Sequence, residues 1–191
     1  MSTIQKAFKQ MQWSFLFFID YSVNGIDILP DIVGLLVMMN ALGKIINESP
    51  HFAHAKKVMP LLIVLASYEL IEPLLGAYQS AAFLAWFAVG RSVLVTVFNI
   101  MLVWLVCNGL RDWAIRYHKP VLARTARRRG MYFSIILACS TIMIGFALIS
   151  PTIFYAVSIP MFMLYIIVTF LLMGLFGLAA KEADTIITHS S

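Results

Sequence analysis

Long apolar segments separated by short polar breaks dominate the chain, and charged side chains are nearly absent from them. Each of the last four segments is long enough, at about 1.5 Å per residue, to cross a hydrocarbon core of about 30 Å as a helix. The first two are shorter and interrupted, so they predict either a tight hairpin of two spans or a pair of half-helices. The pattern therefore predicts an all-α membrane bundle of about six transmembrane helices. The six segments are residues 11–24, 28–46, 58–78, 81–110, 131–150 and 153–180.

The composition agrees with a polytopic membrane protein. Of the 191 residues, 61% are hydrophobic and 12% are charged, and the mean hydropathy is +0.89, whereas soluble domains are about half apolar and about a quarter charged. Six spans of about 20 residues leave no room for a separate soluble domain, so we expect a single integral membrane domain. Its parts are a first hairpin with an Asp-rich turn (1–47), the third and fourth spans (58–110), a basic loop (111–130) and the last two spans (131–180).

Basic residues set the expected orientation, because the cytoplasmic loops of membrane proteins carry an excess of Lys and Arg. Counting spans from the basic loop places both termini, and every basic residue except Arg91, on the cytoplasmic side. The net charge of +5 is then a consequence of topology, and we expect no nucleic-acid partner. Besides the bilayer, the expected partners are anionic lipids or a cytoplasmic protein at the basic loop. The residues assigned to the cytoplasm are Lys6, Lys9, Lys44, Lys56, Lys57, Arg111, Arg116, Lys119, Arg124, Arg127, Arg128, Arg129 and Lys181.

Five acidic residues lie in or at the edges of apolar segments, where a charged side chain costs about 2.5–3.5 kcal/mol on insertion scales. Counting inward from the outer ends of the segments places Asp20, Glu69 and Glu72 in the outer half of the bilayer. Arg91, the one base within a span, falls at the same depth, and its guanidinium needs an anionic partner. We therefore predict an outer acidic pocket that binds a proton or a cation, with Arg91 tuning it. The candidate binding residues are Asp20, Glu69, Glu72, Arg91, Asp27 and Asp31.

Structural roles remain open for the same residues. An ion pair of Arg91 with Glu69 or Glu72 would lock the third segment to the fourth. Asp27 has the position of an N-cap for the second helix, and Asp31, in the first turn, would interact with the positive end of the helix dipole. Asp20 precedes this turn, so capping does not explain it.

No catalytic, metal or cofactor site is expected. The chain has no GxSxG, HExxH or Gly-rich phosphate motif. His51 and His54 form an HxxH in the predicted inner loop, but no suitable third ligand is near, so a solvated or headgroup role is favoured over a metal site. Trp113, near the end of a span, suits the aromatic belt at a membrane interface.

The run FFIDYSVNGIDILPDIVGLLVMMNALGKI resembles the start of small multi-pass membrane proteins of Firmicutes. Their first hairpin carries a phenylalanine-rich run, an aspartate and then G-x-D-I-L-P-D-x-x-G, and HFAHAKKVMPLL resembles their short inner loop. The resemblance covers the first third of the chain and implies a multi-pass protein of the bacterial cytoplasmic membrane, without implying an activity. The matching residues are Asp20, Gly25, Asp27, Ile28, Leu29, Pro30, Asp31 and Gly34.

Three functions remain open on the sequence alone. The first is a small transporter or channel, expected to be a homo-oligomer, whose outer acidic pocket binds a proton or cation. The second is an accessory or regulatory membrane subunit that transports nothing. The third is a protein that binds or modifies lipid headgroups, with Arg91 contacting the phosphate.

Overall fold

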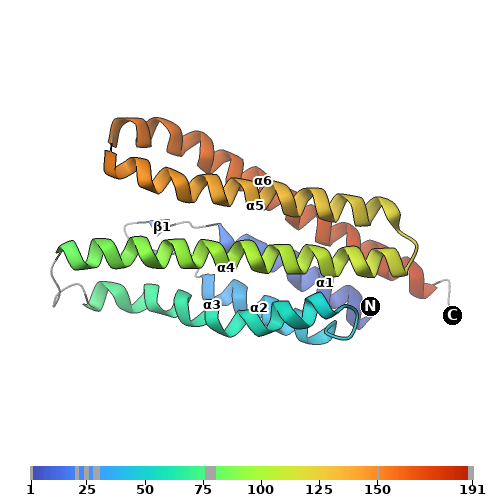
Figure 1. The fold of residues 1–191 in the computed structure, drawn as a ribbon. Helices are drawn as coiled ribbons and strands as arrows, with labels where there is room; N and C mark the ends of the chain where they lie inside the picture. The colour runs from blue at the N-terminus through green and yellow to red at the C-terminus, as the bar shows by residue number, and fades with distance from the viewer. Residues whose placement is uncertain are drawn as a thin grey trace.

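In the computed structural model, six α-helices lie side by side in an elongated bundle among the residues that the structure describes (Figure 1). The prediction of an all-α fold is confirmed. The elements are α1 (Thr3–Ser14), the 3-10 helix η1 (Phe15–Phe18), the paired short strands β1 (Ser22–Val23) and β2 (Ile26–Asp27), α2 (Asp31–Lys44), α3 (Pro50–Leu75), α4 (Ala81–Arg116), α5 (Pro120–Ile149) and α6 (Pro151–Thr188). The structure describes residues 2–19, 22–23, 26–27, 31–75, 81–149 and 151–188, without the side chains of 22–23, 26–27, 69–75, 81–86, 88, 143–149, 151–155 and 187–188.

Each helix packs against its neighbours in sequence, and α1 closes the bundle by packing against α6. Both termini and the α2–α3 and α4–α5 turns lie at one end of the bundle (Figure 1), which we call the terminal end. Ser49 Oγ, just before α3, donates a hydrogen bond to Asp112 of α4 at 2.9 Å. Lys119 Nζ, in the α4–α5 turn, lies 2.5 Å from Glu182 of α6. Polar contacts therefore join neighbouring helices at this end.

Capping residues and prolines explain where the helices begin and end. Ser2 Oγ accepts a hydrogen bond from the backbone N–H of Gln5 at 3.0 Å, which satisfies one of the unpaired donors of the first turn of α1. Helices α3, α5 and α6 each begin with a proline, whose missing N–H costs nothing at that position. His118 follows α4 with a φ of 55°, the left-handed conformation in which helices commonly end.

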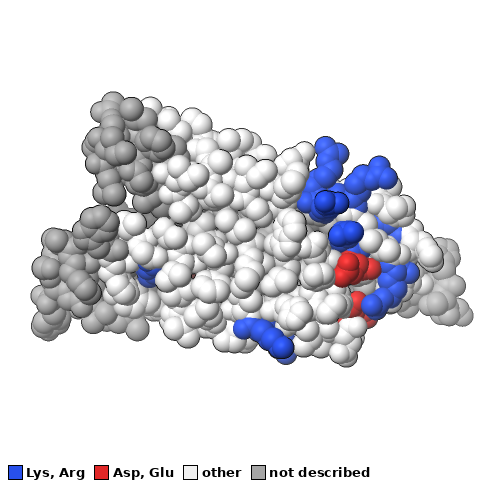
Figure 2. Space-filling model, in the orientation of Figure 1, with Lys and Arg blue, Asp and Glu red and all other residues white. Residues whose placement is uncertain are grey.

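The basic segment 111–130 is mostly helical, which corrects the predicted loop. Arg111 and Arg116 belong to α4 and Arg124 belongs to α5, so the connection is only residues 117–119. Helix α5 also exposes Arg127 and Arg128. Figure 2 shows most of the visible Lys and Arg side chains at the terminal end, and little charge over the rest of the described surface in that view. The predicted segregation of basic residues is thus present in the fold.

The first two helices are shorter than the spans predicted for them. Helix α1 has 12 residues and α2 has 14, or about 18 and 21 Å at about 1.5 Å per residue. Neither alone crosses a hydrocarbon core of about 30 Å. Helix η1 continues α1 to Phe18, and the chain bends at Ile19. The described lengths of α1 and α2 favour a pair of half-helices over two spans.

Aromatic side chains fill the core near the terminal end. Trp113 is 1% exposed, and its ring contacts Phe8 of α1 with centroids 4.9 Å apart. Phe15 of η1 stacks on Phe176 of α6 at 5.4 Å. The prediction that Trp113 belongs to an interfacial belt is wrong, because α1 covers it.

Two helical stretches among the described residues are long and apolar enough to cross a membrane, Val89–Arg116 of α4 and Ala156–Ile186 of α6. Large apolar side chains are exposed along both, with Val97 54% and Ile167 55% exposed. Soluble monomers rarely expose large contiguous apolar patches. This surface therefore indicates association with a membrane.

Candidate functional site

The structure describes the side chains of two of the six candidate binding residues. Asp31 lies in the first turn of α2, and Arg91 lies in α4. Glu69 and Glu72 belong to α3, but their side chains, like all of Asp20, lie outside the described residues. The predicted convergence of Asp20, Glu69 and Glu72 with Arg91 therefore stays a prediction.

Asp27 belongs to β2, where its backbone lies opposite Ser22 of β1. The described part of α2 begins at Asp31, and residues 28–30 lie outside the described residues, so the capping role of Asp27 stays a prediction. Asp31 does lie in the first turn, where the helix dipole stabilises a carboxylate by about 0.3–1 kcal/mol.

A small cavity lies where the broken first hairpin meets the other helices, and we call it the hairpin cavity. Helix η1 ends there at Phe18, whose carbonyl oxygen accepts a hydrogen bond from the hydroxyl of Tyr165 of α6. The cavity volume is about 10 Å³, close to the space that one water needs. Its lining comes from η1, α2, α3 and α4 and consists of Phe18, Asp31, Leu35, Leu62, Ala66, Val95 and Asn99.

Asp31 and Asn99 are the two polar side chains in this lining. Asn99 Oδ1 is buried and accepts no hydrogen bond within the described part of the chain. A buried acceptor left unsatisfied costs about 1–3 kcal/mol, so a water, a protonated carboxyl group or a small cation in the cavity would be stabilised there. Two side-chain groups fall short of the roughly six to eight oxygen ligands that Ca²⁺ takes.

Arg91 lies in a second and much larger hollow, an open groove between α3 and α4 that we call the Arg91 groove. Its volume is about 690 Å³. The guanidinium carbon of Arg91 lies 5.8 Å from the ring centroid of Tyr68, within cation–π range. The Tyr68 ring in turn contacts Phe87 with centroids 5.2 Å apart. The lining residues are Val64, Leu65, Ser67, Tyr68, Phe87, Gly90, Arg91 and Leu94.

The hairpin cavity and the Arg91 groove lie at different levels of the bundle. Asn99 and Arg91 are eight residues apart on α4, which corresponds to about 12 Å along the helix axis. Asp31 lines the hairpin cavity and Arg91 lines the groove. Asp31 and Arg91 therefore belong to separate cavities.

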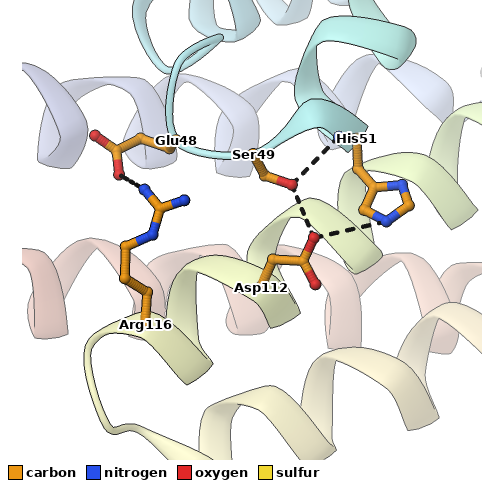
Figure 3. Close-up of polar contacts among 5 residues, drawn as sticks. All are labelled: Glu48, Ser49, His51, Asp112 and Arg116. Atoms are coloured by element: carbon orange, nitrogen blue, oxygen red, sulfur yellow. Dashed lines mark hydrogen bonds and ion pairs between the residues drawn. The ribbon is translucent and has the colours of Figure 1, made fainter.

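A polar cluster joins α3 to α4 at the terminal end (Figure 3). Ser49 Oγ accepts a hydrogen bond from the backbone N–H of His51 at 3.2 Å and donates to Asp112 Oδ2 at 2.9 Å. His51 Nε2 lies 3.6 Å from the same oxygen, and Arg116 Nη1 lies 3.5 Å from Glu48. In a catalytic triad the serine hydroxyl contacts histidine rather than the carboxylate, and Ser49 is only 2% exposed. The cluster is therefore a helix cap.

The HxxH pair lies on a helix and not in a loop. His51 and His54 both belong to the first two turns of α3. No group of three His, Cys, Asp or Glu side chains that could hold a metal ion occurs among the residues that were described. The contact of His51 with Asp112 gives this histidine a structural role.

Sequence reasoning missed two polar residues near the broken hairpin, Asn99 and Tyr165. Both lie in runs that are otherwise strongly apolar, and neither is among the candidate binding residues. A polar group inside a membrane span usually faces the bundle interior and has a partner there. The position of Asn99 in the middle of the uncharged run 92–110 was therefore a usable signal.

Comparison with known proteins gave no relative: no protein-family model, curated protein or solved structure matches the chain. The resemblance of the first hairpin to multi-pass proteins of Firmicutes stays a prediction.

Proposed function

We propose that the chain is a multi-pass protein of the cytoplasmic membrane in which α3 to α6 cross the bilayer and α1 and α2 form a re-entrant hairpin. The four crossing helices have 26 to 38 residues, or about 39 to 57 Å, whereas α1 and α2 are too short. A re-entrant hairpin enters and leaves on the same face, so both termini remain cytoplasmic. Non-helical backbone at membrane depth is tolerated where protein buries it, and Phe18, the last residue of η1, is only 9% exposed.

Contacts between helices support a position for the cytoplasmic membrane boundary. Arg129 Nη1 donates to the carbonyl oxygen of Leu171 at 2.5 Å. The next residue, Gly130, approaches α4 so closely that a Cβ there would lie 2.9 Å from Cys107 Cβ. From this level α5 continues without charge to its end, for about 20 residues or 30 Å. Asn99 is eight residues from Cys107, about 12 Å, so the hairpin cavity lies near the middle of the bilayer.

The hairpin cavity supports a proton-binding function. Helices broken near the bilayer midplane form the substrate and ion sites of many transporters. Asp31 supplies a carboxyl group that takes up and releases a proton, and the buried Asn99 Oδ1 accepts a hydrogen bond from the protonated form. The volume, close to that of one water, favours a proton over a hydrated metal ion. Asp20 and Asp27 belong to the same hairpin and remain candidates for the proton path.

The function that this geometry supports best is a small proton-coupled transporter. The observation that carries the proposal is the buried, unsatisfied Asn99 oxygen in the same cavity as Asp31, at the break of a hairpin too short to span. Glu69 and Glu72, on the segment of α3 next to the Arg91 groove, remain candidates for binding a proton or a cation.

Proton flux into liposomes tests the proposal. Purified protein is reconstituted with a trapped pH-sensitive dye, and a potassium diffusion potential drives protons inward. We expect wild-type protein and Glu48→Gln, which removes a carboxylate at the terminal end, to acidify the lumen faster than empty liposomes. Asp31→Asn should reduce the rate to that of empty liposomes. Wild-type flux equal to that of empty liposomes, or full flux in Asp31→Asn, would refute the assignment.

The membrane topology has its own test. In a chain with Cys107 and Cys139 replaced by alanine, His118→Cys places a thiol in the α4–α5 turn. A membrane-impermeant maleimide should label this thiol in inside-out vesicles and not in intact cells. The opposite pattern would show that the terminal end faces outward.

An accessory or regulatory membrane subunit is the second candidate, and one observation favours it. Arg124, Arg127 and Arg128 are exposed on α5, at the end where the visible positive charge gathers (Figure 2). Such a surface suits an acidic cytoplasmic protein or anionic lipids. A charge-reversed triple variant should then lose a stoichiometric partner in a pull-down. If wild-type protein recovers no such partner, this candidate fails.

A further inference from the structure

We propose that the Arg91 groove binds one phospholipid from the leaflet opposite the terminal end, with its phosphate on Arg91 and an acyl chain between α3 and α4. The proposal depends on the membrane placement above and not on proton binding at Asp31. The groove is separate from the hairpin cavity, so the two sites can be tested independently.

The depth of Arg91 fits a phosphate at the far membrane boundary. Arg91 is 16 residues from Cys107 on α4, or about 24 Å from the level assigned to the cytoplasmic boundary. The remaining distance to the far side of a core of about 30 Å is about 6 Å. An extended arginine side chain covers such a distance by snorkelling towards the headgroups. The guanidinium therefore reaches the layer in which lipid phosphates lie.

The chemistry of the groove matches a lipid with a phosphate at one end. A guanidinium has five N–H donors in a planar fork that suits phosphate oxygens, so it can bind a phosphate together with a partner in the protein. The guanidinium carbon lies 5.8 Å from the centroid of the Tyr68 ring, within cation–π range. The rest of the lining is almost entirely apolar, and Val64, Leu94 and Phe87 are 65%, 50% and 43% exposed. These walls provide the surface for an acyl chain.

The size and shape of the groove depend on a glycine beside the arginine. Its volume of about 690 Å³ lies within the range of about 300–1,000 Å³ typical of small-molecule sites. A Cβ built on Gly90 would meet no atom within 4 Å, so the space next to Arg91 is open. A larger side chain at position 90 therefore has room to extend into the groove. This gives a variant that blocks the lipid while keeping the arginine.

Native mass spectrometry of the full chain tests the proposal. The detergent-purified protein is mixed with phosphatidylglycerol or with diacylglycerol of the same acyl chains, which lacks only the phosphate-bearing headgroup. We expect wild-type protein to retain one phosphatidylglycerol and to retain diacylglycerol at least about tenfold less, since a tenfold difference corresponds to about 1.4 kcal/mol. Arg91→Gln and Gly90→Leu should each lower retention of phosphatidylglycerol about tenfold as well. Arg128→Gln, an exposed arginine at the terminal end, should retain it as wild type does.

Several results would overturn the proposal. Equal retention of diacylglycerol and phosphatidylglycerol would mean that the phosphate is not recognised. Unchanged retention in Gly90→Leu would mean that the lipid lies elsewhere, and this variant decides the matter if Arg91→Gln does not fold. Full displacement of the lipid by inorganic phosphate would identify a simple anion site. Lipid retention and proton flux are measured separately. A negative result for lipid retention does not affect the proposed proton site at Asp31, and a negative result for proton flux does not affect the proposed lipid site at Arg91.

Discussion

The close approach of α3 and α4 at Gly109 gives a quantitative prediction about stability. A Cβ on Gly109 would lie 2.5, 2.6 and 2.9 Å from three atoms of the Phe52 ring. Phe52 is 0% exposed, so the ring has no open space to move into. Overpacking a core costs about 1–3 kcal/mol. Because the new Cβ would clash with three ring atoms, we expect the overpacking cost of Gly109→Ala to be about 3 kcal/mol. Alanine favours a helix over glycine by about 1 kcal/mol, so the expected net loss is about 2 kcal/mol.

Thermal unfolding in micelles, followed by circular dichroism, measures this loss. For a chain of this size about 1 kcal/mol shifts the Tm by about 2–4 °C, so Gly109→Ala should lower it by about 4–8 °C. The matched control is Gly90→Ala, which meets nothing within 4 Å and should raise the Tm slightly. Adding Phe52→Leu to Gly109→Ala should recover part of the loss. A Gly109→Ala protein as stable as wild type would refute the packing of α3 against α4 described above.

Two further predictions concern single hydrogen bonds. Asp112→Ala should lower the free energy of unfolding by about 1 kcal/mol, because Ser49 Oγ loses its hydrogen-bond acceptor. This value allows for the partial exposure of the carboxylate. A thermal melt unchanged from that of the wild type would contradict the helix cap. Tyr165→Phe should cost about 1 kcal/mol through the lost bond to Phe18 and should speed proteolysis between residues 19 and 30. Equal cleavage rates in the variant and the wild type would show that this bond does not hold the hairpin.

The long helices were predictable because one property defines them. Apolar runs of 20 or more residues were recognised in α3 to α6, and the structure has helices there with ends extended by several residues. The extensions are polar, as in the segment from Pro120 to Arg129 that begins α5. Hydropathy alone predicts a loop for such polar helical turns, because it gives no information on whether a helix continues beyond its apolar run.

Helix α1 was mispredicted for the opposite reason. Its apolar positions are spaced rather than continuous: Ala7, Phe8 and Met11 are fully buried, with polar residues between them. The spacing is that of one helix face, and Ser2 is a standard capping residue. These signals were present, but a search for continuous apolar runs passes over them. The burial of Trp113 was not predicted for the same reason, because α1 covers that side chain and α1 itself was not recognised.

The candidate site could be predicted only in part. Charge in an apolar context drew attention to Asp31 and Arg91, and each of these residues lines a cavity. Their assignment to different cavities depends on where α2 begins and on which faces of α3 and α4 meet. The sequence contains no direct measure of either. Asn99 was overlooked because the site prediction rested on charged side chains in apolar segments, and an amide is uncharged.

The closure of α1 onto α6 has a consequence for the order of assembly. Phe8 and Phe15 contact Phe176, and Phe18 is bonded to Tyr165, so the first hairpin is held largely by the last helix to be synthesised. At about 5–20 residues per second, the ribosome needs several seconds to about half a minute to reach that helix after the hairpin has emerged. During this interval α1 and η1 lack their contacts with α6, whereas α2 can already pack against α3. A nascent chain released before α6 would therefore lack the helix–helix contacts of α5 and α1 with α6. Phe18, which lines the hairpin cavity, would also lack its hydrogen bond from Tyr165.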